Sequence, residues 1–198
     1  MWYYVKQSML SFVYLFFTAM TAIAIATIGD NLIWLKVVLG ILNVGLYGVI
    51  IAAASFKDGQ NALKVRMAND LERMQIIKTG EDRPLKLKEE YKPWKGFLTG
   101  FITCVPLLVL LTLHTILILV LGDAYTGAGI TASIIYMMFY LFARVNSAVP
   151  VTPGLFYWML FALPFMMLLT GIPYILGARK IQLQQDAIKA KQRQIYGE

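Results

Sequence analysis

The sequence predicts an all-α integral membrane protein, a helical bundle with four transmembrane helices and amphipathic cytoplasmic helices. Of its 198 residues, 59% are apolar or aromatic and only 15% are charged, whereas a soluble domain is about half apolar and a quarter charged. The apolar residues gather in long runs, and the basic residues lie between and after these runs. The excess of apolar side chains is therefore expected to face lipid.

Four apolar runs are long enough for a helix to cross a hydrocarbon layer of about 30 Å at 1.5 Å per residue. They cover residues 9–28, 32–56, 97–121 and 155–176. The run 9–28 is longer than the apolar stretch of a signal peptide, about 7 to 15 residues, and leads into another apolar run. We therefore expect it to remain as a helix.

A fifth apolar stretch, 130–143, ends at Arg144 after about 14 residues. This length is more typical of a re-entrant or interfacial segment than of a crossing, so residues 124–154 are predicted to lie at the outer surface. The alternative is that this stretch crosses the membrane and the chain has five transmembrane helices.

The basic residues predict the orientation, because Lys and Arg accumulate on the cytoplasmic side of a membrane. Ten of the eighteen lie in the loop 57–96 and five in the tail 179–198. Four crossings place both clusters and both termini in the cytoplasm, whereas five crossings place the tail outside. The Lys-rich composition, the short chain and the lack of a targeting peptide favour the plasma membrane of a bacterium.

Both basic segments contain an amphipathic pattern, which defines a candidate interaction face. Apolar residues recur at spacings of four, four and three in the loop and of seven in the tail, as expected for one face of a helix. The face consists of Leu63, Met67, Leu71, Met74, Ile181, Ile188 and Ile195. These helices either pack on each other and on anionic headgroups, or form a docking surface for another protein.

Small residues at helical spacing predict where the spans pack, since they let helix backbones approach closely. Three stripes have this pattern: Thr18, Ala22 and Ala26; Gly48 and Ala52; Gly96, Gly100 and Cys104. Asn43, near the middle of the second run, is expected to form a hydrogen bond between helices.

The two halves of the chain resemble each other in plan: apolar run, Gly-Asp, apolar run, basic segment. Gly29-Asp30 and Gly122-Asp123 are 93 residues apart, whereas the similar segments 62–66 and 187–191 are 125 apart. A true parallel repeat implies a pseudo-twofold axis along the membrane normal. Chance similarity between apolar helices is the alternative.

Five ionisable residues are expected at the outer level of the membrane, where an ionisable group is a functional candidate because its burial costs at least about 2.5 kcal/mol. This outer polar cluster consists of Asp30, Lys36, His114, Asp123 and Arg144. It would bind an anionic headgroup or relay protons. Alternatively, Lys36 and Arg144 extend to the headgroups, the two Asp residues cap turns, and His114 binds a backbone carbonyl.

No catalytic, metal-binding or cofactor-binding residues are predicted. The motifs GxSxG, HExxH, Walker A and GxGxxG are absent, and a single His and a single Cys exclude a multi-His or Cys-rich metal site. The run Asp58-Gly59-Gln60-Asn61-Ala62 resembles the start of the DGxxAR motif of CDP-alcohol phosphotransferases. Leu63 stands where that family has Arg, and the further aspartates that hold its metal are missing, so we do not assign the chain to it.

Two functions remain. The first is a membrane protein that acts by association, as an accessory subunit or scaffold, with anionic headgroups and a membrane-protein partner or a second copy of itself as its contacts. The second is a small oligomeric transporter or channel that uses the outer polar cluster. Nucleic acid is not an expected partner, because the basic residues do not share a soluble face.

Overall fold

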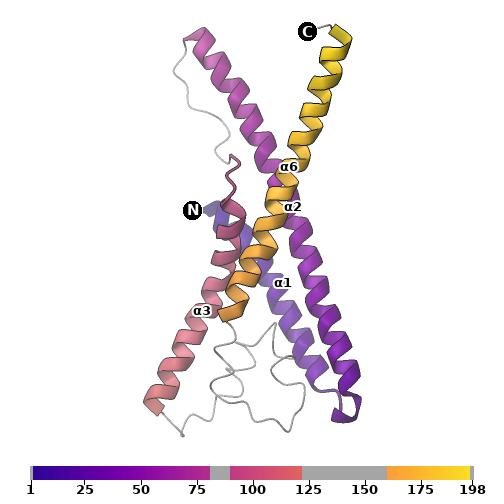
Figure 1. Cartoon of the computed structure of the whole chain (residues 1–198). Coiled ribbons are helices and arrows are strands. Elements are labelled where there is room, and N and C mark those ends of the chain that lie inside the picture. The colour runs from indigo at the N-terminus through magenta and orange to yellow at the C-terminus, as the bar shows by residue number, and fades with distance from the viewer. Residues whose placement is uncertain (1, 81–89, 122–159, 197–198) are drawn as a thin grey trace.

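The computed structural model describes residues 2–80, 90–121 and 160–196, which are almost entirely helical and contain no strand (Figure 1). The elements in chain order are α1 (Trp2–Ala26), the short 3-10 helix η1 (Asp30–Leu32), α2 (Ile33–Thr79), α3 (Lys95–Leu121) and α6 (Ala162–Tyr196). The all-α prediction is confirmed for these residues. In this part of the chain, one helix, α2, is long and apolar enough to cross a membrane. The four or five crossings stay a prediction.

Two of the helices combine an apolar run with a basic amphipathic segment. The second run and the helix predicted after it form one continuous helix, α2, of 47 residues, about 70 Å long at 1.5 Å per residue. The fourth run and the tail likewise join in α6, which has 35 residues. Residues 124–154 and the start of the fourth run lie outside the described residues.

The long helices are arranged around a crossing of α2 and α6. These two helices run in the same direction and form an X in Figure 1, and their mutual contact is the most extensive between the described helices. Helix α3 packs along α6, and α1 packs against α2 and α3. The crossing divides α2 and α6 into a packed part below it and a separate part above it.

The end of α2 is set by a glycine cap. No proline interrupts Ile33–Thr79. The helix then ends at Gly80, whose φ of 69° is left-handed and whose N–H donates to the Ile76 carbonyl. Glycine adopts this conformation without the steric cost of a Cβ. Lys78 in the last turn also interacts favourably with the negative end of the helix dipole.

The packed part buries small polar groups beside apolar ones and exposes many large apolar groups. Large apolar residues are exposed along all four long helices, including Phe17, Leu46, Leu119 and Leu168. Small hydroxyl residues are buried between the helices: Ser8, Ser11, Thr18, Thr99, Thr103 and Thr170. Several of these hydroxyls donate to the carbonyl four residues earlier in their own helix, which satisfies them without water. A water-soluble bundle does not usually expose so many large apolar side chains along each of its helices.

Hydrogen bonds between helices connect the polar interior. The Asn43 side chain donates to the Thr18 carbonyl of α1 over 2.9 Å, which confirms the interhelical role predicted for Asn43. The Thr170 hydroxyl of α6 lies 2.8 Å from the Gly96 carbonyl oxygen of α3. The buried Tyr47 hydroxyl lies 3.5 Å from Ser11 of α1 and 3.5 Å from the Met166 sulfur of α6.

Candidate functional site

The crossing of α2 and α6 is a reciprocal contact between two glycines and two backbones. Gly59 of α2 lies against the Tyr174 carbonyl of α6, and Gly177 of α6 lies against the Phe56 carbonyl of α2. A Cβ at either glycine would overlap the facing carbonyl group. The helices therefore approach as closely as their backbones allow, and this contact fixes where the two helices separate.

A short segment before α3 passes over this crossing. The Tyr91 N–H donates to the Ala62 carbonyl over 3.1 Å, and the Tyr91 ring stacks on Tyr174 with ring centroids 5.4 Å apart. Burial raises the pKa of the Tyr91 hydroxyl, and nearby Arg66 partly opposes this rise. Tyr91 thus joins the segment to both crossing helices.

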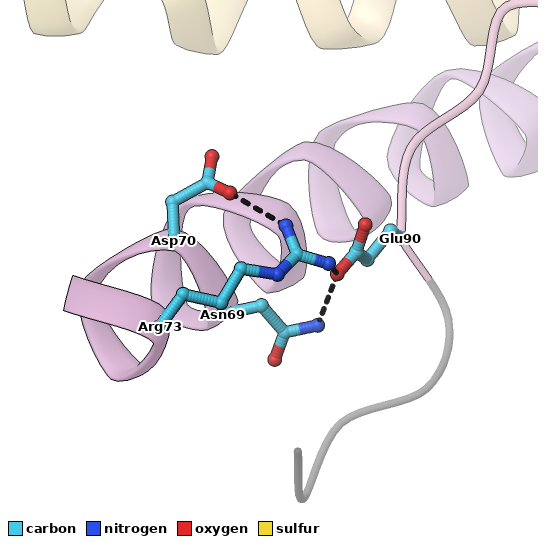
Figure 2. Close-up of polar contacts among 4 residues, drawn as sticks. All are labelled: Asn69, Asp70, Arg73 and Glu90. Carbon is cyan, nitrogen blue, oxygen red and sulfur yellow. Dashed lines mark hydrogen bonds and ion pairs between the residues drawn. The ribbon is translucent and has the colours of Figure 1, made fainter. Parts of the chain in front are cut away.

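Polar contacts hold the same segment to α2 further along the helix. The Asn69 side chain, which is fully buried, donates to the Glu90 carboxylate over 2.8 Å (Figure 2). Arg73 donates to the same carboxylate oxygen and also pairs with Asp70 over 2.9 Å. These contacts brace α2 just above the crossing.

Beyond the crossing, α2 and α6 continue as two separate arms, which we define as the α2 arm (residues 63–79) and the α6 arm (residues 181–196). Their ends lie far apart at the top of Figure 1. Each arm is about 25 Å long at 1.5 Å per residue. The α2 arm has four basic and two acidic residues, and the α6 arm has three basic and one acidic.

The structure divides the candidate interaction face into two groups. Leu63 and Ile181 are buried together at the crossing, with Met67 packed against them. The other four members are exposed, and their exposed fractions are Leu71 65%, Met74 60%, Ile188 55% and Ile195 74%. The arms therefore pack on each other only at their base, and the rest of each apolar stripe is uncovered.

A groove lies beside the crossing, where α2 and α6 begin to separate. Its volume is about 550 Å³. Residues that line it are Phe56, Leu176, Arg179, Lys180, Leu183, Gln184 and Ala187. The Lys180 ammonium lies 5.8 Å from the centroid of the Phe56 ring, a distance at which a cation interacts with an aromatic face. The groove thus has an almost wholly apolar wall, to which Arg179 and Lys180 contribute mainly their aliphatic parts.

The outer polar cluster is described only in part. Lys36 is 2% exposed, so its side chain is enclosed by the protein. Asp30 begins η1 and His114 lies within α3, but neither side chain belongs to the described part of the structure. Asp123 and Arg144 lie outside the described residues. The proximity of the five residues stays a prediction.

In the described ranges, no three His, Cys, Asp or Glu residues come together in a way that could hold a metal ion. Cys104, on α3, is a buried free thiol with an exposed fraction of 2%. The described residues therefore offer no metal centre on which to build a mechanism.

Sequence reasoning missed the residues that form the crossing and the groove. The residues four positions before and after Gly177 are Pro173 and Ile181, so Gly177 belongs to no stripe of small residues. Gly59 has a small residue, Ser55, four positions before it but none four positions after it. The only signal the two glycines share is an aromatic residue three positions earlier, Phe56 or Tyr174. The cations of the groove, Arg179 and Lys180, entered the sequence argument only as charges that set the orientation.

Asp58 is a half-buried carboxyl beside Gly59, and it predicts a pH dependence of stability. Burial raises the pKa of Asp58 from 3.8 to about 6, with Lys57 opposing the rise. Because the folded protein holds this proton more tightly than the unfolded chain, the stability associated with it is present below about pH 4 and is lost as the pH rises to about 6. Asp58→Asn should therefore stabilise the protein more at pH 7.5 than at pH 4.5.

Thermal unfolding in detergent at both pH values measures this difference. Asp186→Asn is the matched control, because it removes the same charge from the exposed α6 arm. We expect Asp186→Asn to leave the unfolding temperature close to that of the unchanged protein. An Asp58→Asn variant with the same gain at both pH values would contradict the prediction.

Comparison with known protein families, curated proteins and solved structures finds no match for this chain. A functional conclusion therefore has to come from its own geometry. The features available for it are the crossing, the two uncovered arms, the groove and the buried Lys36.

Proposed function

We propose that this chain is a multi-pass membrane protein that acts by association, as an accessory subunit or scaffold. The packed part lies in the plasma membrane of a bacterium, and the two arms project into the cytoplasm and bind a partner. The observation that carries this proposal is the separation of α2 and α6 into two basic arms with uncovered apolar stripes.

The large exposed apolar surface of the packed part supports the membrane placement. Exposed apolar residues cover the packed part on α1, α2, α3 and α6, and such extensive apolar surfaces are unfavourable in water. Buried hydroxyls and glycines between the helices are typical of packing in lipid, where small residues and hydrogen bonds replace the hydrophobic driving force. Helix α2 also meets the length and composition required of a transmembrane helix.

Aromatic and basic side chains at the starts of α1 and α3 support a membrane boundary at the level of the crossing. Tyr4 stacks on Trp94 with ring centroids 6.2 Å apart. The Lys92 ammonium lies 5.9 Å from the Trp94 ring, and that of Lys95 lies 5.8 Å from the Tyr4 ring. Trp, Tyr and basic residues favour the headgroup level. On this placement, the arms begin where the hydrocarbon ends.

The common direction of α2 and α6 supports an even number of crossings between the arms. Both helices run upward through the crossing in Figure 1, and both arms lie on the same side of it. A membrane around the packed part then leaves both arms in one compartment. The density of Lys and Arg in the arms favours the cytoplasm for that compartment.

The chemistry of the arms indicates the kind of partner. Each arm has a net charge of about +2 from the residues counted above, and each exposes two large apolar residues of the candidate interaction face. A partner with apolar side chains bordered by acidic residues complements both features. Exposed apolar residues that gather on one face are typical of a protein interface.

Purification from native membranes in mild detergent tests the association. We expect the full-length chain to bring down one stoichiometric partner. The double variant Ile188→Lys with Ile195→Lys should reduce its recovery about tenfold or more, which corresponds to about 1.4 kcal/mol of binding free energy. The matched control, Gln182→Lys with Gln194→Lys, adds the same charge to exposed positions of the same helix that lie off the apolar stripe, and it should retain the partner. Equal losses from both double variants would contradict a role for the apolar stripe.

A transporter or channel is the second candidate, and the burial of Lys36 favours it. An ionisable group within a transmembrane segment is expensive and marks a functional site by default, and Lys36 is 2% exposed within the second apolar run. The same purification distinguishes the two functions. A homo-oligomer that carries no partner and moves solute in liposomes would support transport and contradict the association proposal.

A further inference from the structure

We propose that the groove between α2 and α6 binds the headgroup and glycerol of an anionic phospholipid. This inference rests on the membrane placement proposed above and adds a specific ligand site to it. The site is formed by Phe56, Leu176, Arg179 and Lys180, together with Leu183, Gln184 and Ala187.

The position of the groove along the helices fits the boundary between hydrocarbon and headgroups. Phe56 and Leu176 are the last residues of the second and fourth predicted spans, and Arg179 begins the basic tail. The structure brings these ends together, so that two apolar side chains and two cations line one groove. A phospholipid presents the same order of chemistry, with acyl chains on one side of its glycerol and a phosphate on the other.

The lining accounts for both parts of such a ligand. Arg179 and Lys180 supply positive charge for the phosphate, and the guanidinium of Arg179 matches the geometry of phosphate oxygens. Gln184 adds a neutral hydrogen-bonding side chain. None of the described residues that line the groove is acidic, so the charge of an anionic headgroup is not opposed. The groove has a volume of about 550 Å³ and is largely open on one side.

Below the groove, the outer face of α6 offers a path for an acyl chain. Leu168 and Ile172 precede Leu176 by eight and four residues, so the three lie on one helical face. Their exposed fractions are 52%, 47% and 49%. Arg179, Lys180 and Leu183 continue the same face upward at spacings of three, four and seven from Leu176. One face of α6 therefore changes from apolar to cationic at the groove.

Lys180 is held in place for this role. Its ammonium lies 5.8 Å from the Phe56 ring of the neighbouring helix, which limits the freedom of a side chain that would otherwise be flexible. The reciprocal glycine contact fixes the two helices that carry Phe56 and Arg179 beside the groove. A preformed arrangement of cations loses less entropy on binding than free lysines on an exposed arm.

Lipid retention by the full chain tests this site. The protein is reconstituted in nanodiscs that contain equal amounts of phosphatidylglycerol and phosphatidylcholine, and the lipids that remain bound after extraction are measured by native mass spectrometry. We expect the unchanged protein to retain phosphatidylglycerol preferentially. Arg179→Gln with Lys180→Gln should reduce this preference about tenfold or more, since each cation near an anionic lipid contributes to binding.

Two further variants distinguish binding in the groove from a general effect of positive charge on the helix. Lys189→Gln with Lys191→Gln removes the same charge from exposed positions of the same helix and should keep the preference within about twofold of the unchanged protein. Ala187→Trp keeps every charge but fills the groove, and it should abolish the preference. Soluble glycerol 3-phosphate should not displace the lipid, because it lacks acyl chains for the apolar face.

Each other outcome contradicts a specific statement. Equal losses from the two double Gln variants, or no loss from either, would overturn the groove as the site. Displacement by glycerol 3-phosphate would assign the groove to a free phosphate instead of a lipid. A chain that fails to enter nanodiscs or liposomes would contradict the membrane placement itself, whereas a chain that enters them without lipid preference would contradict only this inference.

Discussion

Gly59→Ala and Gly177→Ala are each expected to lower the unfolding temperature of the purified protein by about 5 °C, because a methyl group at either position wedges α2 and α6 apart. The added Cβ meets backbone atoms of Tyr174 or Phe56, which cannot move aside as the end of a flexible side chain can. Inserting a methyl group into a closely packed contact costs about 1 to 3 kcal/mol. For a chain of this length, each kcal/mol corresponds to about 2 to 4 °C.

Gly45→Ala is the matched control within α2. A Cβ added to Gly45 would have nothing within 4 Å of it beyond its own helix, so alanine there meets open space. It should stabilise the helix by about 0.5 to 1 kcal/mol. A rise in the unfolding temperature for Gly45→Ala and a fall for Gly59→Ala would distinguish the crossing contact from the general effect of replacing a helical glycine.

The combined variant tests whether the two glycines act as one contact. If Gly59→Ala already separates the helices, Gly177→Ala adds less to the damage than it causes alone, because neighbouring sites that share a contact are not additive. The measurement is thermal unfolding of the unchanged protein, the two single variants and the double variant in the same detergent, with size-exclusion chromatography to detect aggregation. Glycine variants as stable as Gly45→Ala would contradict the crossing.

The helices themselves were predictable, because their signals are local. The long apolar runs and the 4, 4 and 3 spacing after the second run favour helices both in lipid and in water. The continuation of α2 through the predicted membrane boundary follows from the absence of proline in Ile33–Thr79 and the left-handed Gly80 at its end. Such local rules apply without knowing which helices pack against each other.

The crossing was not predictable, since its contacts join residues far apart in the chain. The stripes of small residues did include Gly96 and Gly100, which pack against α6. They also included Gly48, whose nearest neighbour on α6 is only a Leu169 side-chain atom at 3.7 Å. Spacing shows which helix faces carry small residues, but a single glycine that packs against a carbonyl leaves no periodic pattern in the sequence. Which glycine forms the contact depends on where the partner helix packs.

The crossing also bears on the repeat hypothesis. Gly59 and Gly177 are 118 residues apart, as are Phe56 and Tyr174, and each glycine meets the aromatic residue of the other helix. The basic segments that suggested the repeat are instead 125 residues apart. The two separations differ by seven residues, or about two helical turns. If α2 and α6 are related by a pseudo-twofold axis, the residues to superimpose are therefore those of the crossing and not those of the arms.

Cysteine labelling of the two arms is expected to give the same result on both, since the crossing keeps them on one side. In a Cys104→Ala background, Gln75→Cys reports on the α2 arm and Gln192→Cys on the α6 arm, and both positions are exposed. A membrane-impermeant maleimide added to intact cells should label neither. Both should react fully once the cells are permeabilised.

Asn31→Cys supplies the positive control, because Asn31 is exposed in η1, between α1 and α2, and is predicted to lie outside. It should react in intact cells. Labelling of Gln192→Cys but not Gln75→Cys from outside would support five crossings, and it would equally contradict the parallel crossing of α2 and α6. Such a result would also require three cations of the α6 arm to pass the membrane, at about 2.5 kcal/mol or more for each at the membrane centre. This experiment therefore tests the four-crossing topology and the parallel glycine contact of α2 and α6 at the same time.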